Sequence, residues 1–194
     1  MVQTEAEICN MALSRIGEVR ISDLSDLSEE AYQCKLFYYQ TRDEVLRDYP
    51  WNFAGLEAEL APLSDTNLTP FEYKYQLPLN CLNVRILIDI AGESYADLED
   101  EYRVGGRAIY TNVSPCAIRY TQKVEDPGLF DSCFVEAFAL KLASKIAFNL
   151  TGDRALEADM LQQYITFQPV AKSLDGFESR NKKKKKKYWD EYGR

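Results

Sequence analysis

The hydrophobic pattern of the chain changes period twice. Before residue 60 and after residue 125, apolar residues recur three or four positions apart, which indicates helices with one buried face. Between these regions, stretches such as FEYKYQLP and NVRILIDI alternate or are β-branched, as is typical of strands. Helical segments on both sides of a β segment predict an α+β fold, in which a small antiparallel β domain is inserted between helices.

The first two helices have recognisable end signals. Thr4 and Glu7 fit a capping box, and Gly17 offers a stop for the first helix. The second helix is expected to end at residue 48, because Pro50 disfavours helical geometry in the residue before it. The aromatic stretch YPWNFA at this end favours a core anchor over a base-stacking platform, because no Lys or Arg is interleaved with the rings.

Two further helices are predicted after the insertion. One begins at Asp131 and breaks at LTGD, residues 150–153, and the next runs from about Arg154 to Leu174. Pro169 is expected to kink this last helix or to end it early. Two helices before the insertion and two after it predict an antiparallel four-helix domain.

The resulting domain organisation has three parts. A helical domain comprises residues 1–60 and 125–180, an inserted β domain comprises residues 71–124, and an extended C-terminal arm comprises residues 181–194. Within the β domain, EYRVGGRAIYTN predicts a hairpin around Gly105 and Gly106, since both turn positions tolerate positive φ.

Charge is distributed unevenly along the chain. The arm carries six lysines, one arginine and two carboxylates, whereas the rest of the chain carries 16 basic and 29 acidic residues. An acidic body is not typical of a sequence-reading DNA-binding protein, which usually has a basic face on its folded domain. It suits a wall along which DNA slides, because phosphate contacts create nonspecific affinity.

The sequence offers little for catalysis. It contains no histidine, which excludes histidine-based triads and metal sites, and it has no glycine-rich phosphate-binding motif. Its five cysteines are odd in number and include no C-x-x-C pair, so we expect reduced thiols without a zinc site. We therefore predict a protein that is not an enzyme and binds no cofactor or metal.

Two alternatives stay open at this point. A glycan hydrolase needs only two carboxylates, and the densest acidic cluster is DLEDE, residues 97–101, although a solvated loop is the simpler interpretation. A nucleic-acid-binding protein could act through the lysine run. No apolar run is long enough to cross a bilayer, and the N-terminal residues do not resemble a signal peptide, so we expect a soluble, unprocessed protein that does not enter a membrane.

Several stretches, in order along nearly the whole chain, resemble the tail tubular protein A family of short-tailed bacteriophages. They are EICNMALSRIGEVRISDL, CKLFYYQTRDEVLRDYPWNFA, YQLPLNCLNV, IRYTQKVEDPGLFDSCFVEAFALKLASKIAFNLTGD and the terminal YWDEYGR. The lysine run departs from the family's pattern.

The resemblance implies a head-to-tail adaptor in the virion tail, assembled in the host bacterial cytoplasm. Such proteins form a ring, expected to be a dodecamer, between the portal protein and the tail nozzle protein. DNA passes through the ring, which also helps to retain the packaged genome. The implied partners are therefore the portal, the nozzle, further copies of the chain and, transiently, DNA.

Three groups of residues are candidates for these contacts. An arm with charge for approach and aromatic rings for anchoring is expected to bind the portal or a neighbouring copy: Lys182, Lys183, Lys184, Lys185, Lys186, Lys187, Tyr188, Trp189 and Tyr192. The hairpin tip is expected to face the nozzle: Val104, Gly105, Gly106 and Arg107. Acidic residues are candidates for the lumen: Asp97, Glu99, Asp100 and Glu101.

Overall fold

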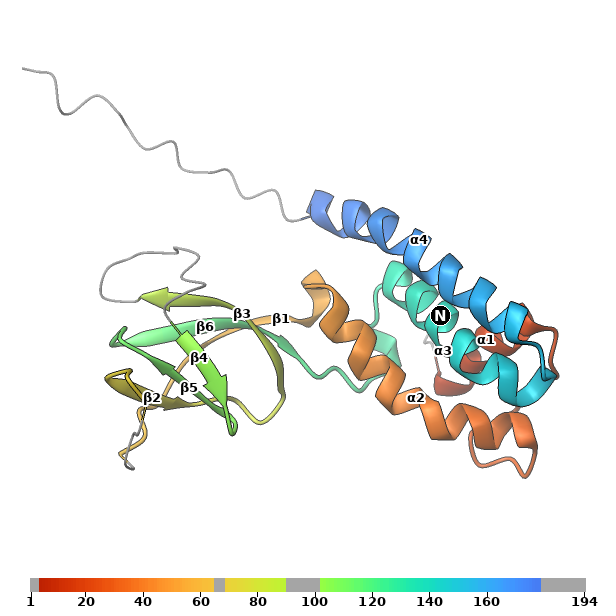
Figure 1. Ribbon diagram of the computed structural model, residues 1–194, viewed down its shortest axis with the longest axis horizontal. Coiled ribbons are helices and arrows are strands. Elements are labelled where there is room, and N and C mark those ends of the chain that lie inside the picture. The colour runs from red at the N-terminus through yellow and green to blue at the C-terminus, as the bar shows by residue number, and fades with distance from the viewer. Residues whose placement is uncertain (1–3, 65–68, 90–101, 179–194) are drawn as a thin grey trace, which may run out of the picture.

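The protein is described by a computed structural model over residues 4–64, 69–89 and 102–178. Within these residues it is an α+β protein with four α-helices and two three-stranded antiparallel sheets. The helices form one lobe and the sheets form another, which lie next to each other along the longest axis (Figure 1). We call them the helical lobe and the β lobe. The predicted α+β class is confirmed.

Helix α1 (Glu5–Ile16) has the predicted capping box. The Thr4 hydroxyl accepts a hydrogen bond of 3.2 Å from the backbone N–H of Glu7, whose carboxylate accepts one of 2.9 Å from the N–H of Thr4. Gly17 ends the helix at φ 79°, a left-handed conformation that glycine adopts without a Cβ clash. Both ends of α1 are thus determined by adjacent residues.

Helix α2 (Glu29–Asp48) begins after Ser28, whose hydroxyl accepts a backbone hydrogen bond from the first turn. It ends before Pro50, as predicted. The indole Nε1 of Trp51 then donates a hydrogen bond of 2.9 Å to the carbonyl oxygen of Val45, and Trp51 is only 3% exposed. The prediction that this aromatic stretch anchors the core is confirmed.

The chain enters the β lobe through β1 (Gly55–Glu59), a strand that lies within the stretch 1–60 assigned to the helices and was not predicted. It pairs antiparallel with β6 (Cys116–Gln122), from Gly55 opposite Thr121 to Glu59 opposite Ala117. Strand β3 (Cys81–Asp89) pairs with the other edge of β6. The first sheet therefore has the order β1-β6-β3.

The second sheet has the order β2-β5-β4. It contains β2 (Tyr73–Gln76), β4 (Tyr102–Gly105) and β5 (Ala108–Thr111). The β lobe has a small hydrophobic core of its own, separate from that of the helices, and its buried residues include Leu60, Tyr75, Leu77, Leu87, Ile109, Cys116, Ile118 and Tyr120.

Two long helices follow the β lobe. Helix α3 (Ser132–Thr151) begins at Asp131, whose carboxylate accepts a hydrogen bond from a first-turn N–H, and ends at Gly152. Helix α4 (Arg154–Glu178) contains Pro169 in its interior. Of the two outcomes expected at this proline, the early end is wrong and the kink stays a prediction. Ala171, beyond the proline, is only 1% exposed, so its burial favours continuation of the helix.

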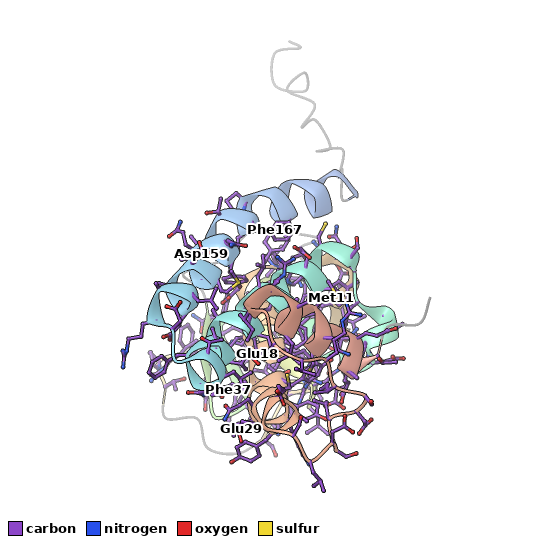
Figure 2. All side chains as sticks on the ribbon, turned by 90° about the vertical axis from the view of Figure 1, so that its right-hand side faces the viewer. Met11, Glu18, Glu29, Phe37, Asp159 and Phe167 are labelled. Carbon is purple, nitrogen blue, oxygen red and sulfur yellow. The ribbon has the colours of Figure 1, made fainter. Side chains whose placement is uncertain are left out.

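Helix α3 is the centre of the helical lobe, because it packs against α1, α2 and α4. Figure 2 shows Glu29 and Phe37 of α2 at the opposite end of this lobe from Asp159 and Phe167 of α4. The core between the helices includes the fully buried side chains Ile8, Leu13, Tyr38, Leu46, Phe134, Phe138, Leu142 and Ile146. Helices α2 and α4 therefore expose their outer faces on opposite sides of the lobe.

Candidate functional site

The hairpin predicted to face the nozzle exists, but its turn lies one residue later than expected. Strand β4 ends at Gly105, and β5 begins at its partner Ala108. The central turn residues are therefore Gly106 and Arg107, at φ 56° and 62°. The register is set across the strands, where Val104 pairs with fully buried Ile109. Core packing of a strand residue thus overrides the local Gly-Gly signal.

The hairpin tip is held against the rest of the β lobe. The carbonyl oxygen of Arg107 accepts a hydrogen bond of 3.1 Å from the N–H of Leu77, and its guanidinium donates one of 2.8 Å to the carbonyl oxygen of Leu79. Val104 remains 48% exposed. The tip is therefore a positioned surface next to the start of β3 (Figure 1).

The other two groups of predicted contact residues lie outside the described residues. This applies to the lumen candidates Asp97, Glu99, Asp100 and Glu101. It also applies to the arm residues Lys182, Lys183, Lys184, Lys185, Lys186, Lys187, Tyr188, Trp189 and Tyr192. Their contacts with a portal, a neighbouring copy or DNA stay predictions.

Two open grooves run along the β lobe. The first, which we call the arginine groove, has a volume of about 470 Å³ and lies between the end of α2, the start of β3 and the β4–β5 hairpin.

The second groove has a volume of about 720 Å³ and is lined by residues that include Arg85, Arg119 and Glu57. The Glu57 carboxylate accepts two hydrogen bonds from Arg119. Among the described residues that line each groove, there is no pair of carboxylates such as glycoside hydrolysis requires.

A buried arginine that sequence reasoning did not single out connects α2 to the segment after β6. Arg42 is 2% exposed, and its Nε donates a hydrogen bond of 2.9 Å to the Asp43 carboxylate. Glu125 lies 3.8 Å from the same guanidinium, and Lys123 lies 3.5 Å from Asp43 and 3.2 Å from Glu125. The Arg42 guanidinium also lies over the ring of Tyr39. Because the charges compensate one another, we interpret this network as structural.

A second polar cluster joins α2, α3 and α4. The Tyr164 hydroxyl and the Lys141 ammonium each donate a hydrogen bond of 2.6 Å to the Asp48 carboxylate. Burial, together with the neighbouring negative charge of Asp48, raises the pKa of Tyr164 above its ordinary value. Tyr164 thus stays a neutral hydrogen-bond donor at neutral pH, which suits a structural contact between helices.

The cysteine thiols are free, as predicted, and one of them is strongly suppressed as a nucleophile. The pKa of Cys9 is raised by a hydrogen bond with Cys34 and by burial in the core between α1 and α2. Because the thiolate is the reactive form, Cys9 is inert at neutral pH. Across the described ranges there is no group of three or more Cys, Asp or Glu side chains placed to hold a metal ion.

No protein-family model matches the chain, and no curated protein matches it. Among the residues that the structure describes, no helix is both long and apolar enough to cross a membrane.

The outer face of α2 carries a row of exposed apolar side chains, which we call the α2 stripe. Tyr32, Leu36 and Tyr39 are 60%, 54% and 46% exposed and follow the i, i+4, i+7 spacing of one helix face. The buried face of this helix carries Ala31, Cys34 and Tyr38. The second apolar row was visible in the sequence at this spacing, but only the fold shows that no other element covers it within the described part of the chain.

Other exposed apolar side chains of the helical lobe lie outside α2. They are Phe148 at the end of α3 and Leu161 and Ile165 on α4, which are 37%, 44% and 52% exposed. Arg154 lies over the ring of Phe148, at 4.6 Å from its centroid. Exposed apolar side chains therefore occur on both α2 and α4, two helices that each pack against α3 and lie at opposite ends of the lobe (Figure 2).

Proposed function

We propose that the protein is a structural, non-catalytic head-to-tail adaptor of a short-tailed phage. Copies of it form a ring, a dodecamer in this proposal, between portal and tail nozzle in the virion tail, after assembly in the host cytoplasm. DNA passes through the ring, which helps to retain the packaged genome. The observation that carries the proposal is the α2 stripe, with its counterpart on α4.

Exposed apolar rows of this kind favour an assembly protein. Single exposed apolar residues are ordinary, but an ordered row on a helix marks a surface that another protein covers. Exposed apolar side chains on α2 and on α4, at opposite ends of one lobe, suit a head-to-tail contact between identical chains, because each copy can offer one helix to each neighbour. Head-to-tail contacts close into rings when the rotation between copies permits it.

The proposal assigns a role to each of the other parts of the chain. An antiparallel four-helix domain forms the body of the ring, and the inserted β domain, through residues 104–107, faces the nozzle. The extended arm, residues 181–194, binds the portal or a neighbouring copy. The acidic residues 97–101 line the lumen or its rim, where like charge keeps DNA from adhering.

The test combines assembly with a matched pair of surface variants. Leu36→Glu places a charge in the α2 stripe, whereas Leu129→Glu places one on a 63% exposed residue outside it. We expect the pure protein to be monomeric or weakly associated, because its high negative charge opposes self-association. On portals isolated from the same phage, negative-stain images should show rings for the unaltered protein and for Leu129→Glu, and none for Leu36→Glu.

Two results would count against the adaptor. One is a failure of the folded, unaltered protein to bind the portal at all. The other is normal ring assembly by Leu36→Glu, which would remove the observation on which the proposal rests. Truncation after Arg180 tests the arm separately, and it should weaken assembly while leaving thermal unfolding unchanged.

A further inference from the structure

The arginine groove is basic within an acidic chain. The whole protein has 31 acidic and 23 basic residues, yet the described lining of this groove includes two arginines, Arg47 and Arg107, and no Asp or Glu. The lining also includes apolar side chains, Leu82 and Val84 of β3 and Val104 of β4, and it is about as apolar as it is polar. A cationic site with a partly apolar floor is therefore formed where the two lobes meet.

The guanidinium groups of Arg47 and Arg107 differ in the contacts that they already make within the protein. Arg47 is exposed in the last turn of α2, and among the described residues it forms no ion pair. Arg107 donates one hydrogen bond to the carbonyl oxygen of Leu79, and its backbone is fixed by the N–H of Leu77. A guanidinium has five N–H donors, so Arg107 keeps donors for a ligand while being held in place.

We propose that the arginine groove binds an extended, acidic segment of a partner protein. Guanidinium groups pair with carboxylates through two parallel hydrogen bonds, which would fix the segment at two points. Apolar side chains of the segment would cover the floor between these points. The inference goes beyond the adaptor proposal and does not depend on it, because it names the chemistry of a ligand and not an assembly.

A nucleic acid fits this groove less well. Its phosphates would approach a protein of formal charge -8. The described lining of the groove has one aromatic ring, Tyr102, whereas single-stranded binders stack successive bases on several rings. A peptide with two or three carboxylates carries far less repulsive charge and can use the apolar floor. Charge and lining together favour the peptide.

The test uses three fluorescein-labelled peptides in which two glutamates are separated by three, five or seven alternating valines and serines. Matched peptides carry glutamine in place of glutamate. Binding to the full-length protein is measured by fluorescence anisotropy at low and at moderate salt. We expect at least one acidic peptide to bind, and its glutamine counterpart to bind about 100-fold more weakly or not at all, because it loses two ion pairs and each loss of about 1.4 kcal/mol corresponds to a factor of ten.

Variants then locate the binding. Arg47→Glu and Arg107→Glu should each lower the affinity for the acidic peptide about 10-fold, and Arg47→Gln should lower it less. Arg103→Glu is the control, because Arg103 is exposed on β4 but strand alternation directs it away from Val104. Circular dichroism shows whether each variant is folded.

Three outcomes would overturn the proposal. The first is that none of the acidic peptides binds the unaltered protein. The second is that Arg103→Glu weakens binding as much as the groove variants, which would indicate general charge attraction. The third is that a single-stranded DNA oligonucleotide binds more tightly than the peptides and loses affinity in Arg47→Glu and Arg107→Glu, which would assign the groove to nucleic acid.

Discussion

The guanidinium of Arg85 donates a hydrogen bond of 2.9 Å to the carbonyl oxygen of Trp51. A second hydrogen bond, also of 2.9 Å, joins its Nε to the Thr121 hydroxyl. Arg85 therefore connects β3 and β6 of the β lobe to the residue that anchors the end of α2 in the helical core. This contact is one of the links between the two lobes.

The first prediction concerns this connection. Arg85→Met should lower the free energy of unfolding by about 1–2 kcal/mol, because it removes charge-assisted hydrogen bonds and leaves the Trp51 carbonyl without that donor. Gly55→Ala should cost up to about 1 kcal/mol in the unaltered protein, since a Cβ there would lie 2.9 Å from the Arg85 guanidinium. In the Arg85→Met background the same change should be neutral or stabilising, because alanine is favoured over glycine in a strand.

Urea unfolding of the two single variants and the double variant measures this coupling. Effects that add to within about 0.3 kcal/mol would show that Arg85 does not constrain Gly55.

The second prediction concerns a buried hydroxyl. The Tyr38 side chain is fully buried, and its hydroxyl has no hydrogen-bond partner among the described residues. Tyr38→Phe should therefore keep the ring contact with Phe138 and raise the free energy of unfolding by about 1 kcal/mol, because a desolvated polar group is removed. Thermal unfolding checks the sign. Destabilisation by this substitution would indicate that a buried water satisfies the hydroxyl.

The third prediction tests the register of the β4–β5 turn. Gly106 has φ 56°, and Ala at this position should lower the free energy of unfolding by about 1–2 kcal/mol. Gly105 lies in β4 outside the left-handed region, and a Cβ there meets only an ordinary contact at 3.8 Å with the Tyr110 ring. Gly105→Ala is thus the matched control and should cost little. If chemical denaturation shows that both variants lose the same free energy of unfolding, the central turn residues are Gly105 and Gly106 instead.

The fourth prediction concerns pH. Burial opposes the charged form of Glu44, but the hydrogen bonds and positive charge of Lys145, with a smaller contribution from Lys141, lower the pKa of Glu44 below its ordinary value. A carboxyl whose pKa is depressed by folding contributes stability above its unfolded pKa, and this contribution is lost as the pH falls through the folded pKa.

Glu44→Gln should therefore cost roughly 0.5–1 kcal/mol at pH 7, a small value because the carboxylate is partly exposed to solvent. At pH 3 the difference between the variant and the unaltered protein should shrink. Urea unfolding at both pH values measures it, with Glu59→Gln on β1 as the control. A pH-independent difference would mean that Glu44 acts through packing and not through its charge.

Local signals in the sequence determined the ends of the helices. Thr4 and Glu7 begin α1, Asp131 begins α3, and Gly17 and Gly152 end α1 and α3, as the structure shows. These assignments succeed because a cap is a contact between residues at most a few positions apart. The division into helices around inserted strands follows from hydrophobic period, which is likewise a local property.

Only the tertiary structure decided features that depend on distant partners. Strand β1 exists because β6, some sixty residues later, supplies its hydrogen bonds, and LEAE alone does not distinguish strand from helix. The turn register follows from burial of Ile109, and α4 continues past Pro169 because the helix remains packed as far as Ala171.

The two candidate surfaces likewise combine a local sequence pattern with contacts that only the tertiary structure decides. The spacing of Tyr32, Leu36 and Tyr39 was present in the sequence, but whether that face is covered depends on where α3 and α4 pack. The arginine groove combines Arg47 from a helix with Arg107 from a turn sixty positions later. No local rule brings them together, because their proximity results from the docking of two separate hydrophobic cores.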